Sequence, residues 1–458
     1  MQTEREDADF LIEIATATPT PLRAGVVLPK RTVCPEVRLP LTAGAGEAAR
    51  PRAEQIRTVE ELGAALAESR RHYAPFLENH APTLPTTRTV QAVDRFEWRI
   101  ERPDDRANFD RALAGEGAWE TVTVPHYGPP LGTAATLYRT VINLTPELMR
   151  RDRIMLCFAG VDYACQVYLN GVCIGSHEGF FDAFEFDCTG VARESNNVLL
   201  VRVVNDYPML GSRAGDQVID GDKIYAATGL GYDDPQEGWH HCPPAMGIYN
   251  RVTIEGRSRL HIEDLWVRPL VSDRTVDLRL EIKNAGTNPF ESVAILVSIF
   301  GRNFAAQVHV DHRHQGWNKF VRGFGDLDHG CDEEVPALMG LGTNYIRIVL
   351  PMGEFRVWDL ETPWLYQAQI KLLDAKERVL DVAERQFGMR SFVQDEHSTP
   401  KGKFMLNGRE IRLRGANTMG NLERCVMQGD FDQLRDDILL AKLTHMNFLR
   451  LTQRPVHR

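Results

Sequence analysis

The sequence lacks long apolar runs and lacks a basic segment followed by an apolar one. No stretch approaches the roughly 20 consecutive apolar residues that a membrane-spanning helix needs. The first residues, Met1-Gln-Thr-Glu-Arg-Glu-Asp-Ala-Asp9, are acidic and do not follow the order of a secretory signal peptide. We therefore expect a cytoplasmic protein that makes no contact with a membrane.

An excess of positive charge is also missing. The 53 lysines and arginines are outnumbered by 63 aspartates and glutamates, which gives a formal net charge of −10. Binding to a phosphate backbone requires a basic face. We therefore expect no nucleic-acid partner.

Cysteine pairs with the spacing of a redox or zinc motif are absent. The eight cysteines are Cys34, Cys157, Cys165, Cys173, Cys188, Cys242, Cys331 and Cys425. Cys157, Cys165 and Cys173 lie in apolar, strand-like runs, where a free thiol behaves as a small hydrophobic side chain. The absence of C-x-x-C pairs in a long chain favours reduced thiols without zinc.

Acidic residues in the order of a calcium-binding loop are absent too. Asp216, Asp220 and Asp222 lie close together in a glycine-containing stretch, but their order is not that of an EF-hand. We expect neither a bound metal nor a cofactor.

What the chain does contain is enough for roughly three domains of ordinary size. Residues 1–84 form an N-terminal extension with one predicted helix. Thr58-Val-Glu-Glu61 is a capping box ahead of Leu62 and Leu66, which follow at helical spacing. We expect this extension to pack on the domain that follows it in sequence.

Residues 85–258 have the pattern of an antiparallel sandwich. Cys165–Leu169 and Val172–Gly175 flank Asn170-Gly171, which is the strongest short signal for a hairpin. Asn197–Val204 continues the series of short strands. Short strands separated by Gly, Pro and Asn indicate a β-sandwich.

Residues 259–395 form a second predicted sandwich. Val276–Lys283 alternates apolar and charged residues, which places one face on a core and the other in water. Gln315–Leu341 is rich in Gly, Asp and His and is predicted to be a long loop or an insertion.

Residues 396–458 follow a different pattern. Phe404–Arg414 predicts a hairpin, Asp430 with Gln433 predicts a helix cap with its reciprocal partner, and Met446–Leu451 predicts a strand. Apolar residues at helical spacing follow the cap: Phe431, Leu434, Ile438 and Leu443. Strand, helix and strand form one βαβ unit, whereas a complete barrel of eight needs roughly 250 residues.

Short motifs follow one another in a fixed order along these segments. The first group is Leu137-Tyr-Arg139, Gly160–Ala164, Val167–Gly171, Gly175–Gly179, Phe184–Asp187 and Gly247–Val252. The second group is Trp358–Tyr366, Phe387–Arg390, Phe404–Gly408 and Leu413–Asn417. In these motifs and their order the chain resembles glycoside hydrolase family 2, the β-galactosidase and β-glucuronidase family. The resemblance implies a mainly β chain with a jelly-roll sugar-binding-like sandwich, an immunoglobulin-like sandwich and the first βαβ unit of an incomplete (β/α)8 barrel.

The same resemblance implies a retaining exo-β-glycosidase. Such enzymes use an acid/base and a nucleophile, two carboxyl groups roughly 5–5.5 Å apart. In the family these lie at the ends of barrel strands four and seven, so we expect both beyond residue 458 and expect the chain alone to be inactive. Asp430, Asp436 and Asp437 belong to the first barrel helix, where we expect a cap and a solvated face.

Barrel active sites form at the C-terminal ends of the strands. This rule points to Asn417 after the first strand and to Arg450 on the second. The resemblance places Arg450 where the family has an arginine that keeps the nucleophile ionised, and Gln453 where better-known members have a histidine. A surface arginine and an ordinary loop amide are the alternatives.

Two loops of the first sandwich are further candidates for sugar contacts. One contains Pro125, His126 and Tyr127, and the other contains Trp239 with His240 and His241. Imidazoles can bind hydroxyl groups and an indole can stack on a sugar ring. A purely structural role in the loops is the alternative.

The expected partners follow from these assignments. We expect a carbohydrate substrate and the remainder of the barrel, and we leave a homo-oligomer open. The alternative to an enzyme is a naturally short, non-catalytic carbohydrate-binding or scaffolding protein.

Overall fold

The structure, a computed structural model, describes most of the chain after residue 55. The described residues are 56, 58–107, 109–127, 135–179, 182–204, 213–214, 217–218, 246–290, 292–313, 317–320, 330–335, 339–397, 399, 401–418, 422, 425 and 430–451. The chain divides into two compact units. We call residues 69–206, 245–414 and 455–458 the sandwich unit, and residues 1–68, 207–244 and 415–454 the strand–helix unit.

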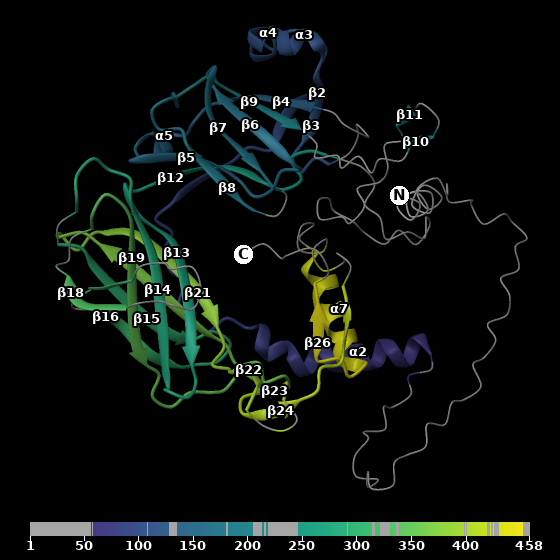
Figure 1. Ribbon diagram of the computed structural model, residues 1–458, viewed down its shortest axis with the longest axis vertical. Helices are drawn as coiled ribbons and strands as arrows, with labels where there is room; N and C mark the ends of the chain where they lie inside the picture. The colour runs from purple at the N-terminus through teal and green to yellow at the C-terminus, as the bar shows by residue number, and fades with distance from the viewer. Residues whose placement is uncertain are drawn as a thin grey trace, which may run out of the picture. The chain divides into compact units, whose positions relative to one another are not determined.

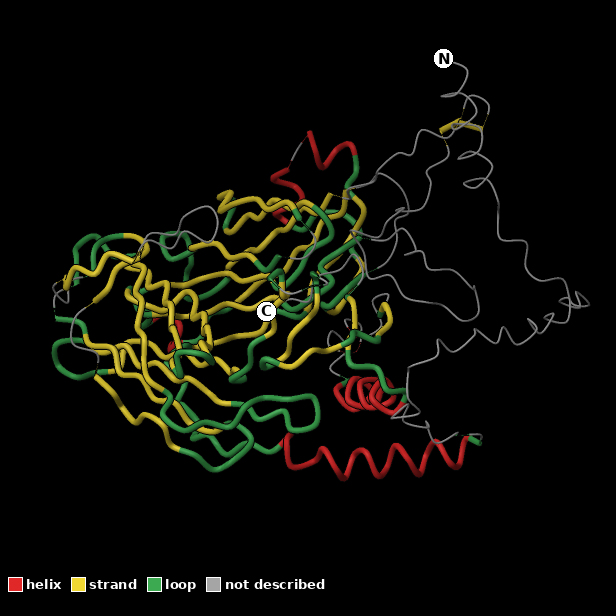
Figure 2. Tube along the Cα trace, turned by 60° about the horizontal axis from the view of Figure 1, so that its bottom comes forward, coloured by secondary structure: helices red, strands yellow, loops and turns green. Residues whose placement is uncertain are grey.

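Most of the described chain is extended, which confirms the prediction of a mainly β protein (Figures 1 and 2). Among the described residues no helix is both long enough and apolar enough to cross a membrane.

The first sandwich has a four-stranded sheet in the order β1-β12-β5-β8 and a six-stranded sheet in the order β3-β2-β4-β9-β6-β7. Its strands are β1 Thr89–Ala92, β2 Arg95–Ile100, β3 Glu120–Thr123, β4 Ala135–Ile142, β5 Arg153–Phe158, β6 Ala164–Leu169, β7 Val172–Glu178, β8 Phe184–Asp187, β9 Asn197–Val204 and β12 Val252–Arg257. Its helices are α3 Pro103–Ala107, α4 Phe109–Ala114 and α5 Pro146–Met149. A separate strand pair is β10 Arg213–Ala214 with β11 Gln217–Val218.

Apolar residues from both sheets of the first sandwich share one core. Leu156 and Phe158 from β5 join Val167 from β6 and Leu199 and Val201 from β9, all of them buried. Since inward and outward side chains alternate along a strand, the two sheets bury one face each against the other.

The predicted hairpin at Asn170-Gly171 is present between β6 and β7. Asn170 has φ 52° and Gly171 φ 83°, the positive angles of a tight hairpin turn. The Asn170 amide also donates to the Val191 carbonyl at 2.9 Å and accepts from the Val198 N–H at 3.0 Å. The backbone angles thus form the turn, and the Asn170 side chain also bonds it to the neighbouring residues Val191 and Val198.

The second sandwich has a five-stranded sheet in the order β13-β14-β19-β17-β18 and a four-stranded sheet in the order β16-β15-β20-β21. Its strands are β13 Leu260–Leu270, β14 Thr275–Asn284, β15 Ala294–Gly301, β16 Gln307–Arg313, β17 Trp317–Phe320, β18 Gly330–Val335, β19 Gly342–Pro351, β20 Tyr366–Leu373 and β21 Val379–Phe387. Its core is a cluster separate from that of the first sandwich.

The alternation in Val276–Lys283 is confirmed on one face and wrong on the other. Val276 and Leu278 lie in the core, as predicted. Asp277 and Arg279 were expected in water, yet both are buried. The Asp277 carboxylate accepts from Arg279 at 3.1 Å and from Arg347 at 3.0 Å, while Trp266 lies over the Arg279 guanidinium. The long side chains of neighbouring strands thus cover the outer face.

The prediction of a long loop over Gln315–Leu341 is also wrong in part. β17 and β18 lie within it and pair antiparallel, from Trp317↔Val335 to Phe320↔Gly330. The polar composition of this segment hid the strands, because backbone pairing at a sheet edge needs no apolar side chains.

The N-terminal extension carries α2 Val59–Tyr73 and the 3₁₀ helix η1 Ala74–Leu77. The capping box is confirmed: the Glu61 N–H donates to Thr58 Oγ1 at 3.1 Å, and the Thr58 N–H donates to the Glu61 carboxylate at 3.3 Å.

Packing of the extension on the domain next in sequence is wrong for residues 73–84. Tyr73 donates to Glu361 at 2.7 Å, and the Phe76 and Trp364 rings lie 4.8 Å apart. These contacts are with the second sandwich, where Trp364 offers an aromatic surface. The segment therefore reaches the second sandwich before the chain enters the first at β1.

Beyond the second sandwich, β22 Phe392–Asp395, β23 Lys403–Leu406 and β24 Arg409–Ile411 form a three-stranded sheet. The predicted hairpin over Phe404–Arg414 is present, but its second strand ends at Ile411. The strand–helix unit then contains β25 Gly415–Asn417, α7 Phe431–Leu443 and β26 Phe448–Arg450.

The helix α7 begins as predicted, but only half of its capping box forms. The Asp430 side chain accepts from the Gln433 N–H at 3.1 Å, whereas the Gln433 amide donates to Asp437 at 2.7 Å instead of reaching back. The predicted apolar stripe also fails at Phe431, which is 63% exposed, while Leu439 is buried. The two strands of this unit are three residues each and offer little surface to a helix of this length.

The described cysteines are free thiols. Cys165 is buried and Cys157 is half-buried, and burial raises the pKa of both to about 12. Cys173 was expected to act as a hydrophobic side chain, but it is exposed on β7 because it faces outward from an edge strand.

Candidate functional site

Two of the predicted site residues are brought together at one end of a parallel strand pair. β25 pairs parallel with β26, and Asn417 stands opposite Arg450 in the register. The Thr418 N–H donates to the Arg450 carbonyl at 3.0 Å, which extends the ladder by one bond. Because both strands run in the same direction, Asn417 and Arg450 lie together at their C-terminal ends. We call this pair the strand-end site.

Gly415 explains how these two short strands approach each other. A Cβ atom at Gly415 would collide with the Phe448 carbonyl oxygen of β26. The Leu413–Asn417 motif therefore contains a glycine for a steric reason. This requirement was visible in the sequence only as a motif and not as a contact.

The described carboxylates between residues 415 and 451 belong to α7 and its cap. Asp432 pairs with Arg435 at 2.8 Å, and Asp436 pairs with the same guanidinium at 3.1 Å. Asp437 accepts from Gln433, and Asp430 caps the helix. These carboxylates are thus engaged by α7 itself and lie on one helix, not at the ends of β25 and β26.

His126, the third predicted site residue that the structure describes, lies in the sandwich unit. Its Nδ1 hydrogen-bonds to the Tyr138 hydroxyl at 2.7 Å, and its ring meets Trp98 edge-on at 5.3 Å. Burial lowers the pKa of His126, with Glu120 acting in the opposite direction. The imidazole is therefore held neutral, as a hydrogen-bonding group with one fixed partner.

Residues that sequence reasoning missed surround His126. The Tyr127 hydroxyl donates to Asp162 at 2.9 Å, and the Tyr127 and Tyr249 rings meet edge-on at 6.4 Å. At Gly247, with φ 145°, a Cβ atom would collide with the His126 carbonyl. The signal was available, because Asp162 and Gly247 both stand in family motifs. We call His126, Tyr127, Tyr138, Asp162 and Tyr249 the His126 cluster.

His177 is a further polar side chain of the first sandwich that the sequence did not single out. Its ring stacks on Phe184 with centroids 3.9 Å apart, and burial lowers its pKa. Its buried Nε2 makes no hydrogen bond with a described residue. A buried imidazole with an open nitrogen can donate to or accept from a hydroxyl group.

The remaining predicted site residues fall outside the described residues. These are Gln453, Trp239, His240 and His241. The three aspartates considered as a calcium-binding loop, Asp216, Asp220 and Asp222, also fall outside them. Within the described part of the chain, no group of three His, Cys, Asp or Glu side chains is arranged to hold a metal ion.

Two family models match the chain. The model described as "Glycosyl hydrolase 2 galactose-binding domain-like" matches residues 131–218, and the model "Glycosyl hydrolases family 2" matches residues 260–390. The first match falls in the first sandwich and reaches β10 and β11, and the second covers the second sandwich.

Curated relatives are similar to this chain over more than half of its length and are longer than it. The β-galactosidase large subunit of Latilactobacillus sakei is 24% identical over 279 residues, which are 60% of this chain and 34% of that protein. The β-galactosidase of Pseudoalteromonas haloplanktis is 24% identical over 393 residues, 79% of this chain and 33% of that one. The chain thus spans about a third of the length of these relatives.

Solved structures share the fold. The β-D-mannosidase from Dictyoglomus thermophilum aligns with a TM-score of 0.55 at 21% identity, covering 79% of this chain and 44% of that one. A Bacteroides uniformis β-glucuronidase aligns with a TM-score of 0.54 at 19% identity, covering 80% and 40%.

Proposed function

Because this chain belongs to glycoside hydrolase family 2, we propose that it forms the N-terminal part of a retaining exo-β-glycosidase. The relatives are β-galactosidases, and the solved structures include a β-glucuronidase and a β-mannosidase. β-Linked sugars are therefore the proposed substrates.

The observation that carries this proposal is the strand-end site. In a (β/α)8 barrel the active site forms where the parallel strands end. β25 and β26 are parallel and are joined by α7, as in the first βαβ unit of such a barrel. Asn417 and Arg450 then contribute to the substrate side of the active site.

The proposed role of Arg450 is electrostatic. A guanidinium donates two parallel hydrogen bonds to a carboxylate, which favours the ionised form and lowers its pKa. A nucleophile must be ionised to attack the anomeric carbon directly. Arg450 thus keeps the nucleophile charged, and the Asn417 amide donates to a sugar hydroxyl.

We place the two catalytic carboxylates beyond residue 458. This placement is supported by the share of the relatives that the chain spans and by the engagement of the described acids of residues 415–451 in α7. The acid/base then protonates the leaving oxygen, while the nucleophile forms a covalent glycosyl intermediate that water later cleaves.

The test is a hydrolysis assay with 4-nitrophenyl β-galactoside, β-glucuronide and β-mannoside. We expect no release of 4-nitrophenol by the 458-residue chain alone, and release by a polypeptide that continues through the two carboxylates. The first-formed sugar should be the β anomer, because retention requires two inversions.

Two outcomes of this assay would count against the proposal. Hydrolysis by the purified 458-residue chain would place a carboxylate pair inside it and contradict the proposal. An inactive extended polypeptide that still binds the sugars would favour the non-catalytic, carbohydrate-binding alternative.

A further inference from the structure

A β-bulge at the edge of the second sandwich brings two histidines together. β16 stands at the end of its sheet, next to β15. In the register His312 stands opposite Val297, and His309 stands opposite Ile299. Two residues therefore lie between the histidines on β16, against one between their partners on β15, which is the count of a β-bulge.

The bulge decides which way the two imidazole rings point. Side chains three positions apart on a regular strand lie on opposite faces of the sheet. The extra residue shifts this alternation by one, and the His309 and His312 ring centroids lie 5.6 Å apart. The spacing His-x-x-His on a strand does not by itself predict a metal site, because the bulge that joins the rings is not visible in the sequence.

Hydrogen bonds around Asp311 hold the bulge in place. This residue has φ 44°, and its N–H donates to Ser298 Oγ at 2.8 Å. Its carboxylate accepts from Lys371 Nζ at 2.8 Å. The Arg313 guanidinium pairs with Glu377 at 2.6 Å. The backbone between the histidines is thus fixed without a ligand, and both of these cations are paired with carboxylates.

His309 already has the hydrogen-bonding pattern of a metal ligand. Its Nε2 lies 2.7 Å from the Pro351 carbonyl at the end of β19. A carbonyl oxygen can only accept, so Nε2 carries the hydrogen and Nδ1 carries the lone pair in the neutral ring. Histidines that bind metals are usually oriented in this way, by a hydrogen bond from the other ring nitrogen to a carbonyl or carboxylate.

The distance between the rings fits one ion bound to both. The His312 ring is exposed and makes no hydrogen bond with a described residue, so it can turn a nitrogen towards His309. A Zn²⁺ ion roughly 2.0–2.1 Å from one nitrogen of each ring lies about 3.2 Å from each centroid. Tetrahedral to trigonal angles then put the centroids roughly 5.2–5.5 Å apart, close to the observed 5.6 Å.

We propose that His309 and His312 chelate a divalent transition-metal ion of the zinc class, with water at the remaining positions. Imidazole nitrogens suit Zn²⁺, Ni²⁺ and Cu²⁺, whereas Ca²⁺ and Mg²⁺ prefer oxygen. Among the described residues no third His, Cys, Asp or Glu side chain completes the set, so the ion is exchangeable. Because His309 is also bonded to β19, the bound ion stabilises the bulge at the sheet edge.

The test is a calorimetric titration of ZnCl₂ into the 458-residue chain, with CaCl₂ as the control ion. We expect Zn²⁺ to bind and Ca²⁺ not to compete with it. His309→Gln and His312→Gln should each weaken binding at least as much as the roughly 10–100-fold loss that follows removal of an outer hydrogen-bonding partner. The double variant should bind no more weakly than either single variant, because losing one ring already breaks the chelate.

Protection of the rings from diethyl pyrocarbonate locates the ion. Zn²⁺ should lower the carbethoxylation of His312 severalfold, measured by peptide mass spectrometry, in the wild type but not in His309→Gln. This readout does not respond to Zn²⁺ held by other histidines or thiols of the chain. The melting temperature should also rise with ZnCl₂ in the wild type and less in either variant, because an ion that binds only the folded state stabilises it.

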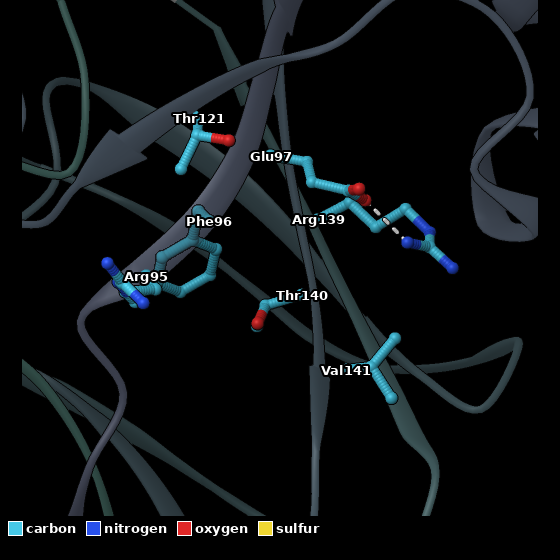
Figure 3. A pocket seen from close by; sticks show the side chains of 7 residues that line it. All are labelled: Arg95, Phe96, Glu97, Thr121, Arg139, Thr140 and Val141. Atoms are coloured by element: carbon cyan, nitrogen blue, oxygen red, sulfur yellow. Dashed lines mark hydrogen bonds and ion pairs between the residues drawn. The ribbon is translucent and has the colours of Figure 1, made fainter.

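Two variants serve as controls. His397→Gln removes an exposed histidine from the loop after β22. Glu97→Gln removes a carboxylate that lines an open hollow on the first sandwich, where Arg139 Nη1 donates to it at 2.5 Å (Figure 3). That carboxylate is already paired with a cation. Both control variants should therefore bind Zn²⁺ as the wild type does.

Three results would overturn the proposal: no binding of Zn²⁺, affinity unchanged in both histidine variants, or His312 equally reactive with and without Zn²⁺. Melting temperatures measured without metal establish that each variant is folded. The titration involves no hydrolysis, so its failure would leave the glycosidase proposal unaffected.

Discussion

At the scale of single residues, buried groups with fixed partners dominate the sandwich unit. His261, at the start of the second sandwich, is 2% exposed, and its Nδ1 lies 2.9 Å from the Ser258 carbonyl. Burial is the largest influence on this imidazole and lowers its pKa; Arg257 and Arg88 act in the same direction, while the hydrogen bond with Ser258 and the charge of Asp381 act against them. The ring is therefore neutral in the folded protein.

This depressed pKa predicts a loss of stability in acid. An unfolded histidine titrates near pH ~6.5, so above that pH neither state binds the proton and His261 contributes no pH dependence. As the pH falls from there towards the lower folded pKa, only the unfolded chain takes up the proton, and stability decreases. The melting temperature should be lower at about pH 5.5 than at about pH 7.5, and less so in His261→Asn. The exposed His397→Gln is the control; equal pH dependence in wild type and His261→Asn would contradict this account.

The sequence pointed to candidate site residues at the ends of predicted strands, and missed the neighbours that only packing brings together. Asn417 and Arg450 were identified from the ends of predicted strands, and their pairing in the register places them together. Asp162 and Tyr138 stood inside motifs, but nothing in their spacing showed that they flank Tyr127 and His126. Such contacts join residues far apart in the chain and depend on the fold.

At the scale of elements, strands and turns with strong local chemistry were predictable. The Asn170-Gly171 hairpin and the Thr58–Glu61 cap form as their residue types require. β17 and β18 were missed because an edge pair in a polar segment has no apolar pattern. α7 was predicted, but its buried side chain was not, since helical spacing alone does not say which face is covered.

The hairpin turn supports a specific stability prediction. Asn170→Ala removes three hydrogen bonds of the side chain, to the Val191 carbonyl, to Asn197 Oδ1 and from the Val198 N–H. It also places an alanine at a positive φ of 52°, which asparagine adopts more readily. We expect a loss of about 3 kcal/mol in the free energy of unfolding, measured by urea denaturation.

Asn196→Ala separates the side-chain bonds from the backbone strain. Asn196 has φ 56° but lies exposed, and its side chain makes no hydrogen bond with a described residue. It should therefore lose only about 1 kcal/mol, the order of the left-handed penalty alone. Equal losses in the two variants would show that the Asn170 bonds contribute nothing.

At the scale of the whole molecule, residues 73–88 link parts of the sandwich unit that are distant in sequence. The segment contacts the second sandwich and then continues into β1 of the first. Its last anchor is Arg88, which pairs with the 2%-exposed Asp381 at 3.1 Å and donates to the Ile262 carbonyl at 2.6 Å. The order of the domains in the sequence did not reveal this link, because the segment that precedes the first sandwich in sequence makes its contacts with the second.

Removing this anchor should destabilise the sandwich unit. Arg88→Ala leaves the buried Asp381 carboxylate without its cationic partner, a change that costs several kcal/mol in fully buried pairs. Arg88 is 28% exposed, so we expect a loss of about 2 kcal/mol in urea unfolding. Arg150→Ala, which breaks an ion pair whose side chains are 70% and 60% exposed, should change stability by less than about 0.5 kcal/mol. Similar values for both variants would contradict an anchoring role.

The central claim is that Arg450, at the end of β26, serves the chemistry of a glycosidase. In the hydrolytically active polypeptide, Arg450→Ala should lower kcat/KM for 4-nitrophenyl β-glycosides about 10²–10³-fold, the usual cost of losing one preorganised electrostatic partner. The melting temperature should change little, and Arg412→Ala, whose side chain is 91% exposed, should leave both quantities unaltered. An Arg450→Ala enzyme with the kcat/KM of the wild type would contradict the claim.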